Sequence, residues 1–127
     1  VVICLISALA YHEITTQIPH AVSVAVPRDA RMPSLDSPPV HAYKFSDAAF
    51  RAGVEKHEID GVTVQIYSAE KTLADCFKYR NKIGMDVVLE ALKLYMSQKP
   101  FSLADLLKYA RVCRVEKVMK PYLEATI

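Results

Sequence analysis

Residues 57–67 read HEIDGVTVQIY, and at this stretch the chain changes from strands to helices. Asp60-Gly61 suits the positive φ angles of a type I′ turn, and apolar residues alternate with others from Val62 to Tyr67. The pattern predicts a β-hairpin. From Ser68 onward the apolar residues recur at intervals of three and four residues instead of two, which predicts helices.

Upstream of the hairpin, the sequence predicts one helix and two further strands. Apolar residues at helical spacing predict a helix over residues 2–12. Residues 21–26 alternate valine with small residues, and residues 40–45 also read as a strand. Residues 47–53 are expected to form one short helical turn that ends at a glycine.

Downstream of the hairpin, apolar stripes predict three to four helices. Ser68 and Ser102 are the expected N-caps of two of them. The order is an N-terminal helix, a small, mostly antiparallel sheet of about four strands, then helices, and strands kept apart from helices in this way indicate an α+β fold. With 127 residues, the chain is expected to form a single domain over 1–127.

The charge is unevenly distributed. Residues 1–68 have a net charge of −2, whereas residues 69–127 have a net charge of +4. The C-terminal half is therefore the better candidate for an anionic partner, although a solvated helix surface has the same pattern. The three glycines are not clustered as a phosphate-binding loop requires.

The cysteines and the first residues indicate a cytoplasmic protein. Cys4, Cys76 and Cys113 are far apart and form no C-x-x-C pair, so each is expected to be a small buried apolar residue in a reducing compartment. The apolar run over residues 1–10 is too short to span a bilayer, and no basic residue precedes it as in a signal peptide. We interpret it as a core helix of a longer polypeptide.

Motifs for covalent chemistry are missing from the sequence. No histidine pair has metalloprotease spacing, no serine lies in a G-x-S-x-G setting, and no Asp/Glu-x-Lys step occurs. We therefore expect no enzyme, no metal and no cofactor. A small metal-dependent hydrolase or nuclease would have to use Asp75, Asp86 or Glu90, converging in one pocket with raised pKa values.

Basic residues form the remaining candidate site, as contacts to DNA phosphates. Five of them recur every three residues from position 108 to 120, which on one continuous helix would spiral around the axis. A break near Arg114 would gather some of them. The candidate phosphate contacts are Arg28, Arg31, Lys78, Arg80, Lys82, Lys108, Arg111, Arg114 and Lys117.

Several blocks of the sequence resemble the AbiEi family of antitoxins. Residues 3–17 resemble the segment that follows the winged helix in that family. Residues 21–28, 61–68 and 71–80 resemble its next blocks. The similarity covers nearly all of the chain, and the matching motifs are structural. The winged helix of that family would end where this chain begins, so we expect the DNA-reading domain to lie outside these residues.

The resemblance implies the C-terminal domain of an antitoxin and transcriptional repressor from a type IV toxin–antitoxin, phage-defence operon. Such a protein represses its own promoter by binding DNA repeats through the winged helix. It opposes a nucleotidyltransferase toxin without a stable complex, and homodimerisation stays open. The alternative is a protein-interaction module that binds the toxin or a second copy of itself.

Overall fold

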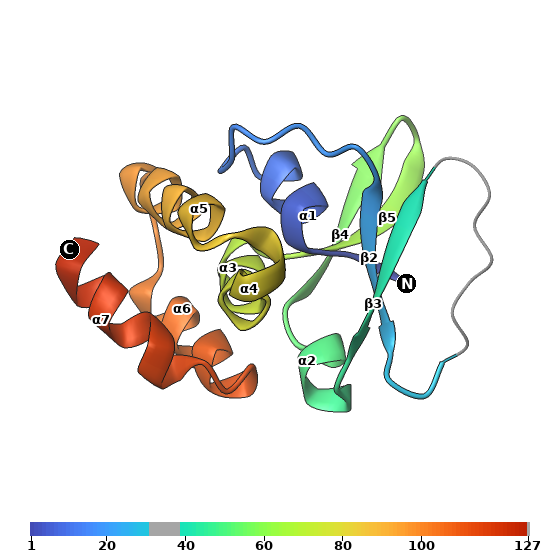
Figure 1. The fold of residues 1–127 in the computed structure, drawn as a ribbon. Helices are drawn as coiled ribbons and strands as arrows, with labels where there is room; N and C mark the ends of the chain where they lie inside the picture. The colour runs from blue at the N-terminus through green and yellow to red at the C-terminus, as the bar shows by residue number, and fades with distance from the viewer. Residues whose placement is uncertain (31–38, 127) are drawn as a thin grey trace.

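The computed structural model describes residues 1–30 and 39–126, and it confirms the α+β fold (Figure 1). The strands are β1 (Val2–Ile3), β2 (Val22–Pro27), β3 (Val40–Phe45), β4 (Val54–Ile59) and β5 (Val62–Tyr67). The helices are α1 (Leu5–Tyr11), α2 (Asp47–Arg51), α3 (Ala69–Lys78), α4 (Arg80–Ile83), α5 (Met85–Ser97), α6 (Leu103–Val112) and α7 (Glu116–Thr126).

The predicted hairpin is confirmed. β4 and β5 pair antiparallel, and the register runs from Val54 opposite Tyr67 to Ile59 opposite Val62. Asp60 and Gly61 make the turn with φ angles of 51° and 80°. Both values are positive, as a type I′ turn requires.

The sheet has five strands in the order β3-β2-β1-β5-β4, and it is mixed instead of mostly antiparallel. The additional strand is β1, so the helix expected over residues 2–12 begins only at Leu5. Val2 lies opposite Ala25 in antiparallel β2, and Ile3 lies opposite Ile66 in parallel β5. Val2 and Ile3 are β-branched, and between two strands their backbone groups pair on both sides, so a short strand replaces the first turn of the expected helix.

The helices form layers on one side of the sheet. Figure 1 shows α1 and α3 beside the sheet, with α5, α6 and α7 beyond α3. The sheet is followed by five helices instead of three to four, because the segment after Tyr79 forms the single-turn helix α4. Both expected N-caps are confirmed: the Ser68 side chain accepts from the Lys71 amide, and Ser102 accepts from the Asp105 amide.

Helix α3 is the centre of the core. Every residue from Lys71 to Phe77 is buried, and the helix contacts α1, α5, α6 and α7. The three cysteines are free and buried, as expected from the sequence. Over residues 1–30 and 39–126, no helix combines the length and the apolarity needed to cross a membrane.

Candidate functional site

The centre of α3 holds a buried ion pair. Lys71 Nζ lies 2.7 Å from Asp75 Oδ2, and the two side chains are 0% and 3% exposed. The Lys71 ammonium also lies 3.8 Å from the centroid of the Tyr67 ring and 5.1 Å from that of Phe45. Aromatic faces attract cations, so these rings replace part of the water that the ammonium loses on burial.

Gly53 makes room for this lysine. A Cβ atom at residue 53 would lie 2.6 Å from Lys71 Cβ, well inside contact distance, and the residue has a φ angle of +74°. The Gly53 carbonyl also accepts from the Ser68 amide at 2.8 Å, just before α3 begins. The glycine therefore lets the chain before β4 pass close enough to α3 to cover Lys71.

Asp75 is held from both sides. Its second oxygen, Oδ1, accepts from the Cys113 thiol at 3.2 Å. Burial raises the pKa of the Cys113 thiol, so the sulfur keeps its proton at neutral pH and can donate. Burial also raises the pKa of Asp75 to about 6, and the attraction of Lys71 and the hydrogen bonds offset only part of that effect.

Three cations lie at a small cavity next to this buried acid. The cavity has a volume of about 40 Å³, and its lining includes Asp75 and the exposed side chains of Arg28, Lys44 and Lys78. These cations come from the ends of β2, β3 and α3, which meet there. Their convergence gives this part of the surface a positive potential.

Lys78 joins this cluster to the turn between α6 and α7. Its Nζ donates to the Cys113 carbonyl at 3.4 Å. Arg114, the next residue, has a φ angle of 59° and ends α6: the Val115 amide bonds to the Ala110 carbonyl, and the Arg114 amide bonds to the Arg111 carbonyl. This is a Schellman motif, in which glycine usually occupies the left-handed position.

A second basic cluster surrounds this turn. Arg111, Arg114 and Lys117 line a shallow groove of about 290 Å³ together with Glu116. Arg111 Nε lies 2.7 Å from Glu116 Oε2, which neutralises that arginine. Within the part of the chain that the structure describes, Arg114 and Lys117 have no such ion pair. Because α6 ends at Val112 and α7 begins at Glu116, a break does lie near Arg114, and it gathers these residues.

Five side chains thus form a basic track, which we define as Arg28, Lys44, Lys78, Arg114 and Lys117. Lys78 is its centre, because it lines the cavity beside Asp75 and also contacts the α6–α7 turn. The first cluster combines residues far apart in the sequence, whereas the second comes from the α6–α7 turn alone. The track joins the two basic groups that the sequence places about 35 residues apart.

The other predicted phosphate contacts are placed differently. Arg80 donates to the Phe77 carbonyl at 2.8 Å and caps the end of α3. The ammonium of Lys108 lies 5.2 Å from the Tyr109 ring, outside both clusters. Lys82 does not line either cluster cavity, but it lines a different groove beside β3 together with Lys44. Arg31 lies outside the described residues.

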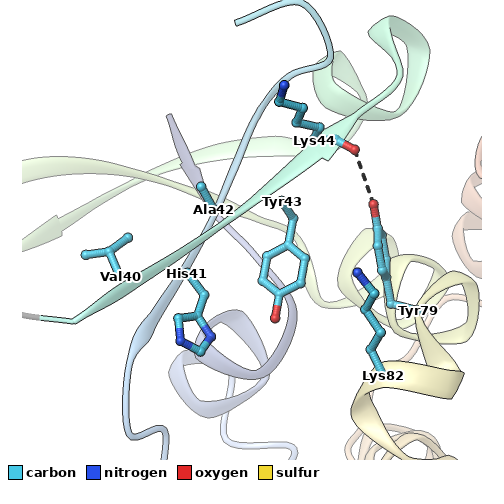
Figure 2. Close-up of a pocket in the computed structure, with 7 residues that line it drawn as sticks. All are labelled: Val40, His41, Ala42, Tyr43, Lys44, Tyr79 and Lys82. Carbon is cyan, nitrogen blue, oxygen red and sulfur yellow. Dashed lines mark hydrogen bonds between the residues drawn. The ribbon is translucent and has the colours of Figure 1, made fainter. Parts of the chain in front are cut away.

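Lys82 lines what we call the edge groove, a depression of about 610 Å³ between β3 and the α3–α4 corner (Figure 2). The groove is lined by Val40, His41, Ala42, Tyr43, Lys44, Tyr79 and Lys82. Sequence reasoning missed Lys44, Tyr43 and Tyr79. Lys44 is the one cation of the basic track that was not predicted as a phosphate contact. The sequence indicated only that residue 44 lies in a strand.

The three acids of the hydrolase alternative have three different environments. Asp75 is buried against Lys71, whereas Asp86 is exposed at the start of α5. Glu90 accepts from the Thr16 amide and hydroxyl at about 3 Å. In residues 1–30 and 39–126, no three His, Cys, Asp or Glu side chains are grouped so that they could hold a metal ion.

No protein-family model and no curated protein match this chain. The resemblance to the AbiEi family therefore stays a prediction from the sequence blocks.

Proposed function

We propose that this chain is a non-enzymatic regulatory domain that contacts nucleic-acid phosphates through the basic track. The observation that carries the proposal is the contact of Lys78 Nζ with the Cys113 carbonyl, 3.4 Å, which joins the two basic clusters. A phosphate backbone is a linear polyanion, and a row of cations from several elements suits it better than one isolated pair.

The chemistry of the track favours positioning over sequence reading. Its members are long, exposed cations at the ends of strands and helices, which reach phosphate oxygens without entering a groove. Such contacts orient a protein on a duplex and add affinity at low salt. Sequence specificity would then come from a separate DNA-reading element.

The resemblance to AbiEi antitoxins extends this proposal to a biological role. On that basis the chain is part of an antitoxin that opposes a nucleotidyltransferase toxin and represses its own operon, with promoter repeats as the DNA target. The basic track would add phosphate contacts to those of the winged helix.

Fluorescence anisotropy with a labelled duplex carrying the operon's promoter repeats tests the proposal. The test variant carries Lys78→Glu and Arg114→Glu, and the matched control carries Lys56→Glu and Lys93→Glu, two exposed lysines outside the track. At low salt we expect the first variant to bind at least about tenfold more weakly than the control, because each cluster of the track loses two units of positive charge. Equal affinity of the two variants, or no binding by the unchanged chain, would refute the proposal.

A further inference from the structure

The edge groove lies along a strand whose outer edge is open. β3 is the last strand of the order β3-β2-β1-β5-β4, and no described residue pairs with it on the side away from β2. The groove is lined by five consecutive residues of this strand on one side and by Tyr79 and Lys82 on the other. A groove between an edge strand and a helix is the usual setting for strand addition.

The backbone of β3 presents alternate donors and acceptors to this groove. The Pro39 carbonyl bonds to the Val22 amide at 3.0 Å, so residue 39 faces β2. The Lys44 carbonyl accepts from the Tyr79 hydroxyl at 3.2 Å, so residue 44 faces the helix corner (Figure 2). Strand residues alternate with a period of two, so both observations place the amide and carbonyl groups of Val40 and Ala42 on the open edge.

This pattern favours a polypeptide over a nucleic acid as the occupant. Phosphate oxygens only accept hydrogen bonds, so they would meet the Val40 and Ala42 carbonyls without a donor. An extended chain offers amides and carbonyls at the same spacing as β3. Open edges of this kind pair readily with another strand.

The charges of the groove favour an acidic polypeptide segment as its occupant. Among the residues that the structure describes, Lys44 and Lys82 are the charged side chains of the groove, and none of those residues lines it with a carboxylate. A second copy of this chain pairing through β3 would add its own Lys44 to the positive charge of the groove, and like charges in close proximity oppose each other. Figure 2 shows Lys44 on one side of the strand and Lys82 on the other. Neighbouring residues of an added strand point to opposite faces, so two adjacent acids could reach both lysines.

We propose that the edge groove binds an extended, acidic segment of a partner protein, which adds to the sheet beside β3 and places adjacent carboxylates at Lys44 and Lys82. The backbone of Val40 and Ala42 supplies the affinity, and the two lysines supply the specificity. Tyr79, held against Lys44, closes one end of the groove.

The test uses a labelled seven-residue peptide with two adjacent glutamates flanked by valines and threonines, and a matched peptide with lysines in place of the glutamates. We expect the acidic peptide alone to bind, and its binding to slow hydrogen exchange of the Val40 and Ala42 amides. Ala42→Pro removes an amide on the open edge of β3, and an edge strand tolerates that loss. The fold should therefore remain, while the affinity for the acidic peptide falls at least about tenfold. Ala42→Val keeps that amide and should bind normally.

Two further arms do not depend on the proline variant folding. Lys82→Glu should weaken the acidic peptide at least about tenfold, and N-methylation of alternate peptide amides should abolish binding. Failure of the acidic peptide to bind, or binding that leaves Ala42 exchange unchanged, would overturn the proposal. Displacement of the peptide by a single-stranded oligonucleotide that protects the same amides would also overturn it. So would slower exchange of these amides in the chain without peptide as the chain concentration rises, because that would indicate self-association through β3.

Discussion

The buried carboxyl of Asp75 should make this protein less stable as the pH rises from about 4 to about 6. Burial raises the pKa of Asp75 to about 6, whereas the ordinary value of the side chain is 3.8. Between these two values the folded chain holds the proton and the unfolded chain releases it. Unfolding is therefore favoured as the pH rises, with the stability contribution fully present below about pH 4 and lost as the pH passes about 6.

The size of the effect follows from the pKa difference. A difference of about two pKa units at about 1.4 kcal/mol per unit corresponds to a loss of about 3 kcal/mol in the free energy of unfolding. The direction of this change distinguishes a buried ion pair of this kind from a surface ion pair. In a surface ion pair, attraction by the lysine lowers the pKa of the acid, and stability then rises with pH. Here the loss of hydration outweighs the 2.7 Å contact with Lys71.

Urea unfolding isolates this contribution when the unchanged chain is compared with Asp75→Asn. Circular dichroism follows the unfolding at several pH values from 4 to 7. The asparagine variant carries a fixed offset because Lys71 loses its partner, but residue 75 no longer titrates. The stability of the unchanged chain relative to the variant should therefore fall by about 3 kcal/mol over this range. Asp86→Asn, at an exposed carboxyl, controls for the loss of a surface charge. A relative stability that rises with pH, or stays constant, would refute the reasoning.

Gly53→Ala should destabilise the fold by about 3 kcal/mol, because the new Cβ atom would lie 2.6 Å from Lys71 Cβ. Gly61→Ala should cost only about 1 kcal/mol, because residue 61 has a positive φ angle but its Cβ atom would have no neighbour within 4 Å. Chemical denaturation compares the two, and equal losses would contradict the crowding argument. Arg114→Gly should stabilise the fold by up to about 1 kcal/mol, because Arg114 has a φ angle of 59°. The same variant should bind the duplex more weakly in the anisotropy assay, and unchanged affinity would show that Arg114 makes no phosphate contact.

Local signals were sufficient for the hairpin and the helix ends. Asp60-Gly61 specifies its turn through the φ angles of two adjacent residues, and Ser68 and Ser102 cap helices through contacts three residues away. In each case the deciding interaction lies within a few residues of the sequence signal.

The short strand β1 could not be predicted in this way. Val2 and Ile3 continue an apolar run at helical spacing, and they become a strand only because residues 24–25 and Ile66 lie on either side of them. That pairing depends on contacts more than 20 residues away. β1 also pairs parallel with β5, and β2 pairs parallel with β3, so the five-stranded sheet is mixed where a mostly antiparallel sheet of about four strands was expected.

The site was predictable only in part. Lys78 and Arg114 were named as candidates, but their connection depends on a contact between α3 and the α6–α7 turn. Lys71 and Asp75 have the spacing of an exposed helical ion pair, and only the approach of Gly53 and the aromatic rings shows that the pair is buried. Sequence periodicity does not contain this information.

The salt dependence of duplex binding tests the basic track most directly. A plot of log affinity against log salt concentration should have a slope of about −4.5 for the unchanged chain if all five cations contact phosphates. Lys78→Gln, at the centre of the track, should reduce the magnitude of that slope by about 1. A slope near zero, or a slope that Lys78→Gln leaves unchanged, would contradict a track that binds phosphates.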